Sequence, residues 1–280
     1  MTYQFASVRR VASSVATEVL PNDPFVTRLS SIDPLTPDQA RIVAAIHGPP
    51  RRVPARTQFA RAGNSPSSAY VVRAGWAFGY TLLANGERQV VGFLLPGDIL
   101  RPGCPARGTM ELGVETITDT IVSEISMASV CKASQEWPEV HLIFLRLQWE
   151  MLSALVGQLT DIGRRDARAR VAQFLLKLER RLMIVSQAGP DGYYCPISQY
   201  LIADALGLTA IHVNRVLRSL REQHVVTMRN NRVTIHNRAR LRAIAGDAAD
   251  DSDDGAQVVT LNAGRRNGAF PIGSRSRALR

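Results

Sequence analysis

The stretch Gln199-Tyr-Leu-Ile-Ala-Asp-Ala-Leu-Gly-Leu-Thr-Ala-Ile-His-Val-Asn-Arg-Val-Leu-Arg218 decides the fold of the C-terminal part of this 280-residue chain. Its layout is that of two short helices joined by a tight turn, as in a helix-turn-helix. Ala203 is small where the two helices must approach closely, Gly207 lies where the turn needs a left-handed backbone, and Thr209 is a suitable N-cap for the second helix. The apolar positions expected to lock the two helices together are Ile202, Leu206, Leu208, Val213, Val216 and Leu217.

The outward residues of the second helix predict sequence-specific binding to double-stranded DNA. Arg215 suits a bidentate bond to guanine, Asn214 suits adenine, and Ile211 suits the methyl group of thymine. Phosphate contacts are expected from Thr209, His212 and Arg218. The candidate DNA-binding residues on this helix are Thr209, Ala210, Ile211, His212, Asn214, Arg215 and Arg218. An ordinary helical hairpin without a role in DNA binding is the alternative.

A predicted β-hairpin follows the second helix. Its strands are 224–229 and 232–236, and Asn230-Asn231 suits a turn that needs positive φ. Arg229 and Arg232 flank the tip, where phosphate contact is natural, although exposed arginines are common at turns. The hairpin is interpreted as a wing beside the helix-turn-helix.

The positive charge of the chain is concentrated around this motif. The formal net charge is +10, and residues 164–242 hold fifteen Lys or Arg against five Asp or Glu, so the remainder sums to zero. Such a local surplus suits phosphate contacts on nucleic acid. A basic face that is merely solvated is the plainer interpretation.

The region from about residue 51 to residue 129 predicts an antiparallel β-sandwich or barrel. Short runs rich in Val, Thr, Phe and Tyr, such as 69–73, 89–95 and 120–126, alternate with Gly, Asn and Pro turns. Before it, Thr36-Pro-Asp-Gln39 predicts a capping box that opens a short helix through His47. Residues 1–24 are expected to be a loose tail.

Beyond Glu136 the apolar period becomes helical. One stripe is spaced as an a/d seam of roughly two and a half heptads: Leu142, Leu145, Trp149, Leu152, Val156 and Leu159. A neighbouring stripe is expected to pack on the β-domain: Phe144, Leu147, Met151, Leu155 and Ile162. Two stripes on a long helix between two domains favour a homodimer seam, and the alternative is a single domain that buries both stripes in its own core.

Further helices complete the C-terminal region. Gly163 is expected to interrupt the long helix, and Asp166 to cap the next one. The turn at 187–192 follows that helix, and a last helix spans 238–245. Residues from Asp247 onward hold too few apolar residues for a core and are expected to be disordered.

Taken together, residues 25 to 246 resemble the Crp/Fnr family of bacterial regulators, best at 163–172 and 203–217. The resemblance implies an α+β fold with a jelly-roll-like antiparallel β-roll sensor domain, a dimerisation helix and a winged helix-turn-helix. It also implies a palindromic operator, recognition helices about 34 Å apart, and RNA polymerase as a partner. The implied divisions are a tail at 1–24, the β-roll at 25–135, the dimerisation helix at 136–163, the winged domain at 164–246 and a tail at 247–280.

Departures from the family pattern limit the effector and alter the expected operator. The Gly-Glu-Leu segment and the arginine that grip a cyclic nucleotide in some members are replaced by Pro96-Gly-Asp98 and by Met110-Glu111-Leu112, so cyclic nucleotide binding is not expected. N-terminal cysteines that hold an iron–sulfur cluster in other members are missing. Ile211 stands where many members carry Glu, so the operator is expected to differ in at least one base pair of each half-site.

Other function classes find less support in the residues. There is no nucleophile–base pair, metal constellation or phosphate-cradling loop, so neither an enzyme nor a bound metal or cofactor is expected. No apolar run suggests a membrane span, and a cytoplasmic location is expected. A ligand sensor that acts through protein interaction, with an inactive DNA motif, is the second hypothesis. Cys104 is read as an inert thiol, with a redox switch as the alternative.

Overall fold

The computed structural model describes residues 23–60, 68–100, 103–104, 109–110 and 112–246. Nearly all of the predicted N-terminal tail and the whole C-terminal tail therefore lie outside the described residues. The side chains of residues 101–111, including Cys104, lie outside them as well.

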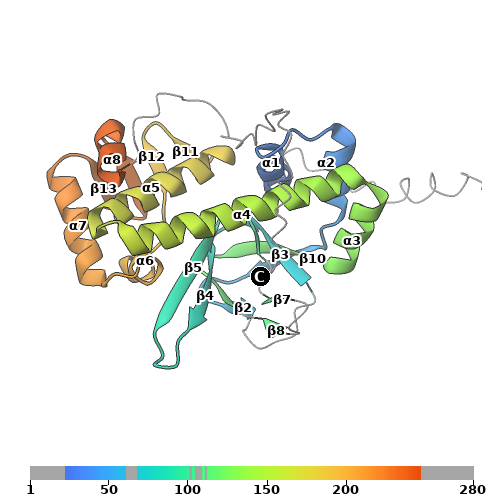
Figure 1. Ribbon diagram of the computed structural model, residues 1–280, viewed down its shortest axis with the longest axis horizontal. Helices are drawn as coiled ribbons and strands as arrows, with labels where there is room; N and C mark the ends of the chain where they lie inside the picture. The colour runs from blue at the N-terminus through green and yellow to red at the C-terminus, as the bar shows by residue number, and fades with distance from the viewer. Residues whose placement is uncertain (1–22, 61–67, 101–102, 105–108, 111, 247–280) are drawn as a thin grey trace, which may run out of the picture. The chain divides into compact units, whose positions relative to one another are not determined.

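Two four-stranded antiparallel sheets form the N-terminal domain, as the strand pattern predicted (Figure 1). The first has the order β1-β10-β3-β6: Pro50–Val53, Thr120–Ser126, Ser68–Ala74 and Ile99–Leu100. The second has the order β2-β9-β4-β5: Gln58–Ala60, Gly113–Thr116, Ala77–Leu82 and Arg88–Leu94. A short hairpin pairs β7 (Gly103–Cys104) with β8 (Thr109–Met110). Inward residues of both sheets, such as Val72, Leu94 and Val114, share one apolar cluster.

Three short helices cover one end of this domain, and the sequence patterns predicted only one of them. The capping box at Thr36 opens α2 (Pro37–Ala45) as expected. Helix α1 (Pro24–Ser30) begins where the predicted tail ends and was not predicted; the Asp23 carboxylate accepts from Phe25 N at 2.9 Å and caps it. Helix α3 (Met127–Glu136) was also missed, because its pattern follows β10 without a break.

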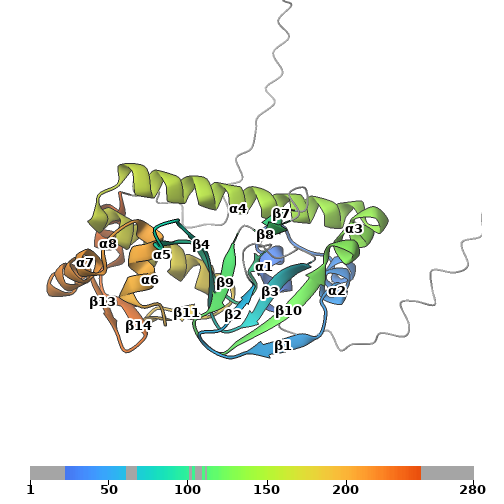
Figure 2. The same ribbon diagram turned by 90° about the horizontal axis from the view of Figure 1, so that it is seen from below.

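Helix α4 (Pro138–Arg164) runs along the β-sheets in both ribbon views (Figures 1 and 2). Its buried face, which includes Ile143, Phe144 and Leu147, packs on α1, α3 and the sheet. The predicted break after this helix is confirmed, but it lies just beyond Gly163: the helix continues through Arg164 and ends where Arg165 adopts an extended backbone.

The second apolar stripe of α4 is buried only in its first half. Met151 and Leu155 were expected to pack on the β-domain, but they are 40% and 48% exposed. Ile143 and Leu147, in the first half of the helix, are in contrast only 1% and 6% exposed. Among the described residues, α4 is the one helix long and apolar enough to cross a membrane, judged by length and composition only.

The C-terminal region holds four helices and a four-stranded antiparallel sheet. The helices are α5 (Ala167–Ile184), α6 (Gln199–Leu206), α7 (Ala210–Glu222) and α8 (Arg238–Ala245). The sheet has the order β11-β12-β14-β13: Ala188–Gly189, Gly192–Tyr194, Arg232–Ile235 and Val226–Arg229. The stretch 187–192 was predicted only as a turn, but it also contains β11 and the first residue of β12. Asp166 caps α5 as predicted, accepting from Ala169 N at 2.8 Å.

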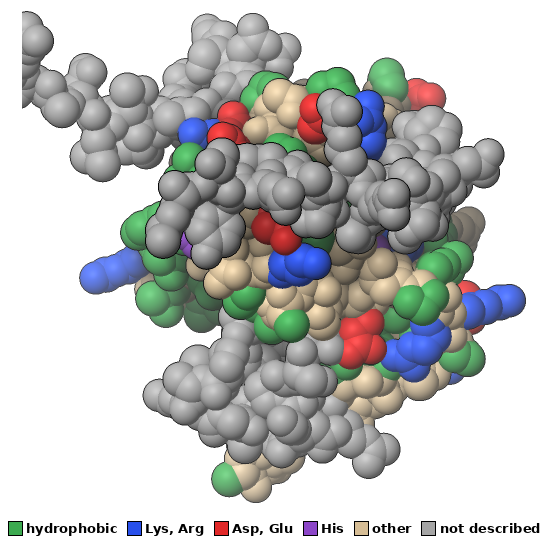
Figure 3. Space-filling model, turned by 90° about the vertical axis from the view of Figure 1, so that its right-hand side faces the viewer, with side chains coloured by type: hydrophobic (Ala, Val, Ile, Leu, Met, Phe, Trp, Pro, Cys, Tyr) green, Lys and Arg blue, Asp and Glu red, His purple; other side chains and the backbone are tan. Residues whose placement is uncertain are grey.

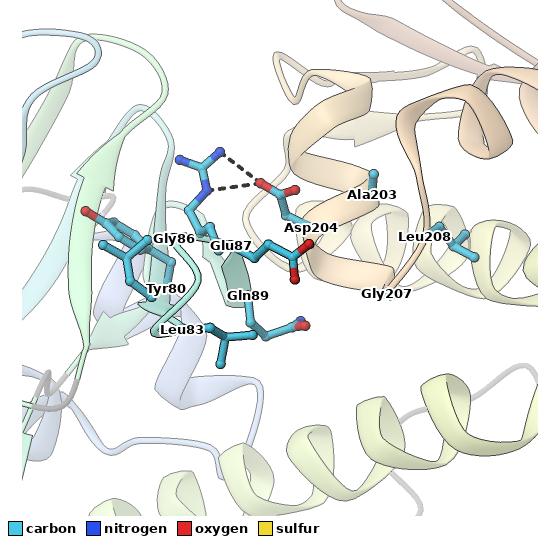
Figure 4. A pocket seen from close by; sticks show the side chains of 11 residues that line it. Tyr80, Leu83, Gly86, Glu87, Gln89, Ala203, Asp204, Gly207 and Leu208 are labelled. Atoms are coloured by element: carbon cyan, nitrogen blue, oxygen red, sulfur yellow. Dashed lines mark hydrogen bonds and ion pairs between the residues drawn. The ribbon is translucent and has the colours of Figure 1, made fainter.

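The β4–β5 hairpin contacts the first helix of the helix-turn-helix. The Arg88 guanidinium donates to Asp204 Oδ2 from Nε at 3.0 Å and from Nη2 at 2.9 Å. It also lies over the rings of Phe78 and Tyr80, 5.1 and 5.7 Å from their centroids. Figure 4 shows Asp204 reaching from α6 toward the hairpin. The hairpin and α6 line a cleft of about 620 Å³. The contact joins the β-domain to the helix-turn-helix.

We expect Arg88→Asp to lower the free energy of unfolding by about 1–2 kcal/mol, because it removes a charge-assisted bond and places two carboxylates side by side. Adding Asp204→Arg restores opposite charges and should recover most of that loss. Urea denaturation of the single and double variants measures both effects. Additive losses in the double variant would show that the pair does not connect the two regions.

Candidate nucleic-acid interface

The turn between α6 and α7 has the geometry that the sequence predicts. Gly207 adopts φ 63° and ψ 43°, the left-handed conformation that ends α6. Leu208 N then donates to Ala203 O at 3.1 Å, which closes the helix end. The Thr209 hydroxyl accepts from His212 N at 3.2 Å and caps α7. These backbone and side-chain bonds fix the start of α7 relative to α6.

Helix α7 presents one apolar face to the core and one polar face to solvent. The buried side chains are Val213, Val216, Leu217 and Leu220. They pack with α5, α6 and the wing in the C-terminal core. Ile211, at the start of the opposite face, is 75% exposed. An apolar side chain this exposed at a helix N-terminal turn is available for contact with an apolar group of a partner, such as the methyl of thymine.

The other candidate residues of α7 differ in their surroundings. Asn214 Nδ2 donates to Gln199 Oε1 at 2.9 Å, and Arg218 Nε donates to Glu222 Oε1 at 2.8 Å. The Arg215 side chain is exposed and makes no hydrogen bond or ion pair with any other described residue. Its guanidinium is therefore available to a ligand of the exposed face.

Three further candidates lie at the start of α7. Thr209 and His212 are exposed, while the Thr209 hydroxyl is already engaged in the cap. Ala210 was placed among the outward residues, but it is only half-exposed and packs against the C-terminal core. Its methyl group points partly inward because α7 enters the core from its first turn.

The wing is a β-hairpin whose strands, β13 and β14, are joined by a two-residue turn. Asn230 and Asn231 adopt φ 51° and 56°, as the predicted turn requires. Arg229 and Arg232 are paired across the tip of β13 and β14, and both are exposed. Arg232 Nη2 also donates to Asp191 O at 3.4 Å. Two arginines thus flank one exposed turn beside the helix-turn-helix.

Several basic residues of the C-terminal region form ion pairs within the protein. Lys177 Nζ and Arg165 Nε lie 2.6 and 2.9 Å from the carboxylate oxygens of the buried Asp161. Arg238 pairs at 2.5 Å with the buried Glu179, and Arg181 pairs with Asp98. Asp161 and Asp98 lie outside residues 164–242, so their ion pairs reduce the free positive charge of this segment below its surplus of ten, whereas Glu179 is already counted in that surplus. At the opposite end, formed by α1–α3, the visible surface mixes charges of both signs (Figure 3).

Potential metal ligands and thiols occur in the part of the chain that the structure describes. The described residues contain no group of three His, Cys, Asp or Glu side chains able to hold a metal ion. Burial raises the pKa of the Cys195 thiol to about 11, so it remains protonated at neutral pH.

Sequence patterns missed one residue of the interface. Gln199 is the first residue of α6 and follows the N-cap Ser198, which accepts from Leu201 N at 3.3 Å. The cap signal was present in the sequence. The side-chain partner of Gln199 depends on how α6 crosses α7, and no local pattern contains that information.

Comparison with known proteins finds similarity at two levels, in the helix-turn-helix domain alone and over most of the chain. Residues 169–244 match the Crp-like helix-turn-helix domain. The nitrogen fixation regulation protein FixK of Bradyrhizobium diazoefficiens is 32% identical over 179 residues, which are 64% of this chain and 74% of that protein. The chain belongs to the Crp/Fnr family. Two further proteins, one known by sequence and one by structure, are similar to the chain over comparable lengths.

The transcriptional activator protein FnrL of Cereibacter sphaeroides is 32% identical over 63% of this chain and 71% of its own length. The solved structure of FixK2 from Bradyrhizobium japonicum has a TM-score of 0.64 at 28% identity, and covers 72% of this chain and 98% of that one. The chain is a DNA-binding transcription regulator of the Crp/Fnr type with an α+β fold. These Crp/Fnr relatives are regulators, so they do not favour a sensor with an inactive DNA motif, the second hypothesis.

We expect Gly207→Ala to lower the free energy of unfolding by about 1–2 kcal/mol, because an L-residue is strained in the left-handed region. A Cβ here would meet Ile162 Cγ2 at 3.7 Å, an ordinary contact, so backbone strain is the only penalty. Gly207→Asn is the matched control and should cost less, because Asn tolerates this conformation. Equal stability of all three proteins in urea denaturation would contradict this description of the turn.

Proposed function

We propose that this regulator binds a two-fold symmetric operator as a homodimer, with α7 of each protomer in a major groove. The observation that carries the proposal is the exposed face of α7, where Ile211, Asn214 and Arg215 project together from a capped helix. The domain divisions predicted from the sequence are kept in this proposal: a β-roll sensor at 25–135, a dimerisation helix at 136–163 and a winged DNA-binding domain at 164–246.

The dimer seam is supported by the exposure of α4. Its six predicted seam residues range from 37% exposed at Leu145 to 72% at Leu159. The full seam is Leu142, Leu145, Trp149, Leu152, Val156 and Leu159, and the exposed Met151 and Leu155 extend it. A contiguous apolar surface of this kind marks an interaction site. Its near-heptad spacing suits a second copy of the same helix better than a membrane or an unrelated partner.

The DNA contacts divide into base readers and phosphate contacts. Arg215 would bond guanine, Asn214 adenine, and Ile211 would meet a thymine methyl. Phosphate contacts are assigned to the helix start and the wing: Thr209, His212, Arg218, Arg229 and Arg232. Ala210 borders the base edges without a polar group. Arg218 must exchange its bond to Glu222 for a phosphate, so its net contribution should be smaller than that of Arg215.

The remaining partners follow from the family. RNA polymerase is the proposed partner for regulation, and the cytoplasm is the proposed location. A cyclic nucleotide is not the proposed effector, because Asp98 of the Pro96-Gly-Asp98 turn accepts from Leu95 N at 2.7 Å and pairs with Arg181. The turn offers a phosphate a carboxylate, which repels it, and the nearby Arg181 is already paired with that carboxylate. The turn therefore provides no cationic anchor for a cyclic nucleotide.

We expect Arg215→Ala to weaken binding by about 1–3 kcal/mol on DNA that carries the preferred base pair, because a bidentate bond to one guanine is lost. Discrimination at that base pair should disappear, while affinity for scrambled DNA changes little. Fluorescence anisotropy at fixed salt concentration measures both affinities. Equal losses on operator and scrambled DNA would refute the assignment of Arg215 as a base reader.

We expect Leu152→Glu to raise the dimer dissociation constant at least about tenfold, because a carboxylate replaces an apolar side chain in the seam. Met183→Glu on α5 is the control, since Met183 is 43% exposed and Leu152 is 49% exposed. Sedimentation velocity over a concentration series measures the dissociation constant. A monomeric wild-type protein, or equal behaviour of both variants, would contradict a seam on α4.

A further inference from the structure

The carboxamide of Asn214 is held by a residue outside its own helix. Its Nδ2 donates to Gln199 Oε1 at 2.9 Å, across fifteen residues of sequence. Gln199 is half-buried at the start of α6, and the Ser198 cap fixes the backbone there. The hydrogen bond is exposed, and its acceptor oxygen comes from the first residue of a capped helix.

The orientation of a carboxamide decides what it can read. Rotation about the last side-chain torsion of Asn exchanges its oxygen and its nitrogen, and both orientations are accessible to a free side chain. Adenine presents an N6 donor and an N7 acceptor in a fixed order along the major groove. Only one orientation of the Asn214 carboxamide therefore matches a given adenine.

We infer that Gln199 is a positioning residue for base readout, because its oxygen selects the orientation in which Asn214 offers its carboxamide to DNA. The bond to Gln199 uses one of the two N–H groups of Nδ2, so the second N–H and Oδ1 remain for adenine. This inference rests on the proposed reading of DNA by Asn214. It adds that base preference at this position depends on a residue of α6.

The neighbouring polar residues of α7 are not held in this way. Arg218 pairs with Glu222 of its own helix, and Arg215 has no partner among the described residues. Gln199 would contribute to DNA binding differently if it contacted a phosphate directly. In that case it would add affinity for every sequence, without altering base preference.

The test compares two DNA probes. One is the selected operator, and the other carries a changed base pair, in one half-site, at the position where Asn214→Ala relaxes selection. The preference is the ratio of the two affinities. Asn214→Ala should lower it about 5- to 150-fold, the range for one bidentate contact. Gln199→Ala should lower it about three- to tenfold, the range for one hydrogen bond, and should add nothing in the Asn214→Ala background.

Two charged variants separate orientation from attraction to phosphate. Gln199→Glu keeps an acceptor for Asn214 Nδ2, so the preference should stay within about twofold while affinity for both probes falls by repulsion from phosphates. Gln199→Lys has no acceptor, so the preference should fall while affinity for both probes rises. Gln187→Ala is the matched control, because it deletes an exposed carboxamide that lies outside α6 and α7. Thermal melting checks that every variant is folded.

Equal loss on both probes in Gln199→Ala, additive with Asn214→Ala, would overturn the inference and identify Gln199 as a phosphate contact. Loss of preference in Gln199→Glu equal to that in Gln199→Ala would also overturn it. If Asn214→Ala relaxes selection at no base pair, the proposed readout by Asn214 itself has failed. These results are distinguishable, because the first two leave the effect of Asn214→Ala intact.

Discussion

The burial of one face of α7 is the constraint on which the DNA-binding surface depends. Val213, Val216 and Leu220 anchor the helix in a core shared with α5, α6 and the wing. Because these residues recur at helical spacing, the side chains between them are forced outward. Burying three such side chains contributes about 1.5–3 kcal/mol each. The exposed order of Ile211, Asn214 and Arg215 is a geometric consequence of that anchoring.

The turn at Gly207 and the cap at Thr209 convert this packing into a defined orientation. The left-handed Gly207 ends α6 and turns the chain toward α7, and the Thr209 hydroxyl satisfies one of the free N–H groups in the first turn of α7, that of His212. Helix α6 is in turn bonded to the β4–β5 hairpin through Arg88 and Asp204. A change in the β-domain therefore has a direct physical connection to the helix that holds Asn214 through Gln199.

The helix-turn-helix and wing were predictable because their signals are local. Gly207, Thr209 and the Asn230-Asn231 pair each require a particular backbone, and the structure has it at every one of these positions. Helices α1 and α3 were missed because one is short and the other follows a strand directly. Both helices still carry an N-cap residue, Asp23 and Ser126, and these two residues are the local signals that could have predicted where the helices begin.

Features that depend on contacts between distant elements were not predictable. The expected burial of Met151 and Leu155 was wrong because the spacing of an apolar stripe does not show which other elements pack on each part of the helix. The pairing of Arg88 with Asp204 spans 116 residues, and no pattern connects the two. Similarly, the composition of residues 164–242 gave the basic surplus but not the ion pairs with Asp161 and Asp98, outside this segment, that neutralise part of it.

The central claim is that two copies of α7 read a symmetric DNA site. Selection of bound sequences from a random double-stranded DNA pool by the full chain tests it most directly. The selected sequences should form an inverted repeat with half-site centres about 10–10.5 base pairs apart, the spacing of successive major grooves. Enrichment of a single unrepeated site, or no enrichment over the starting pool, would contradict the claim.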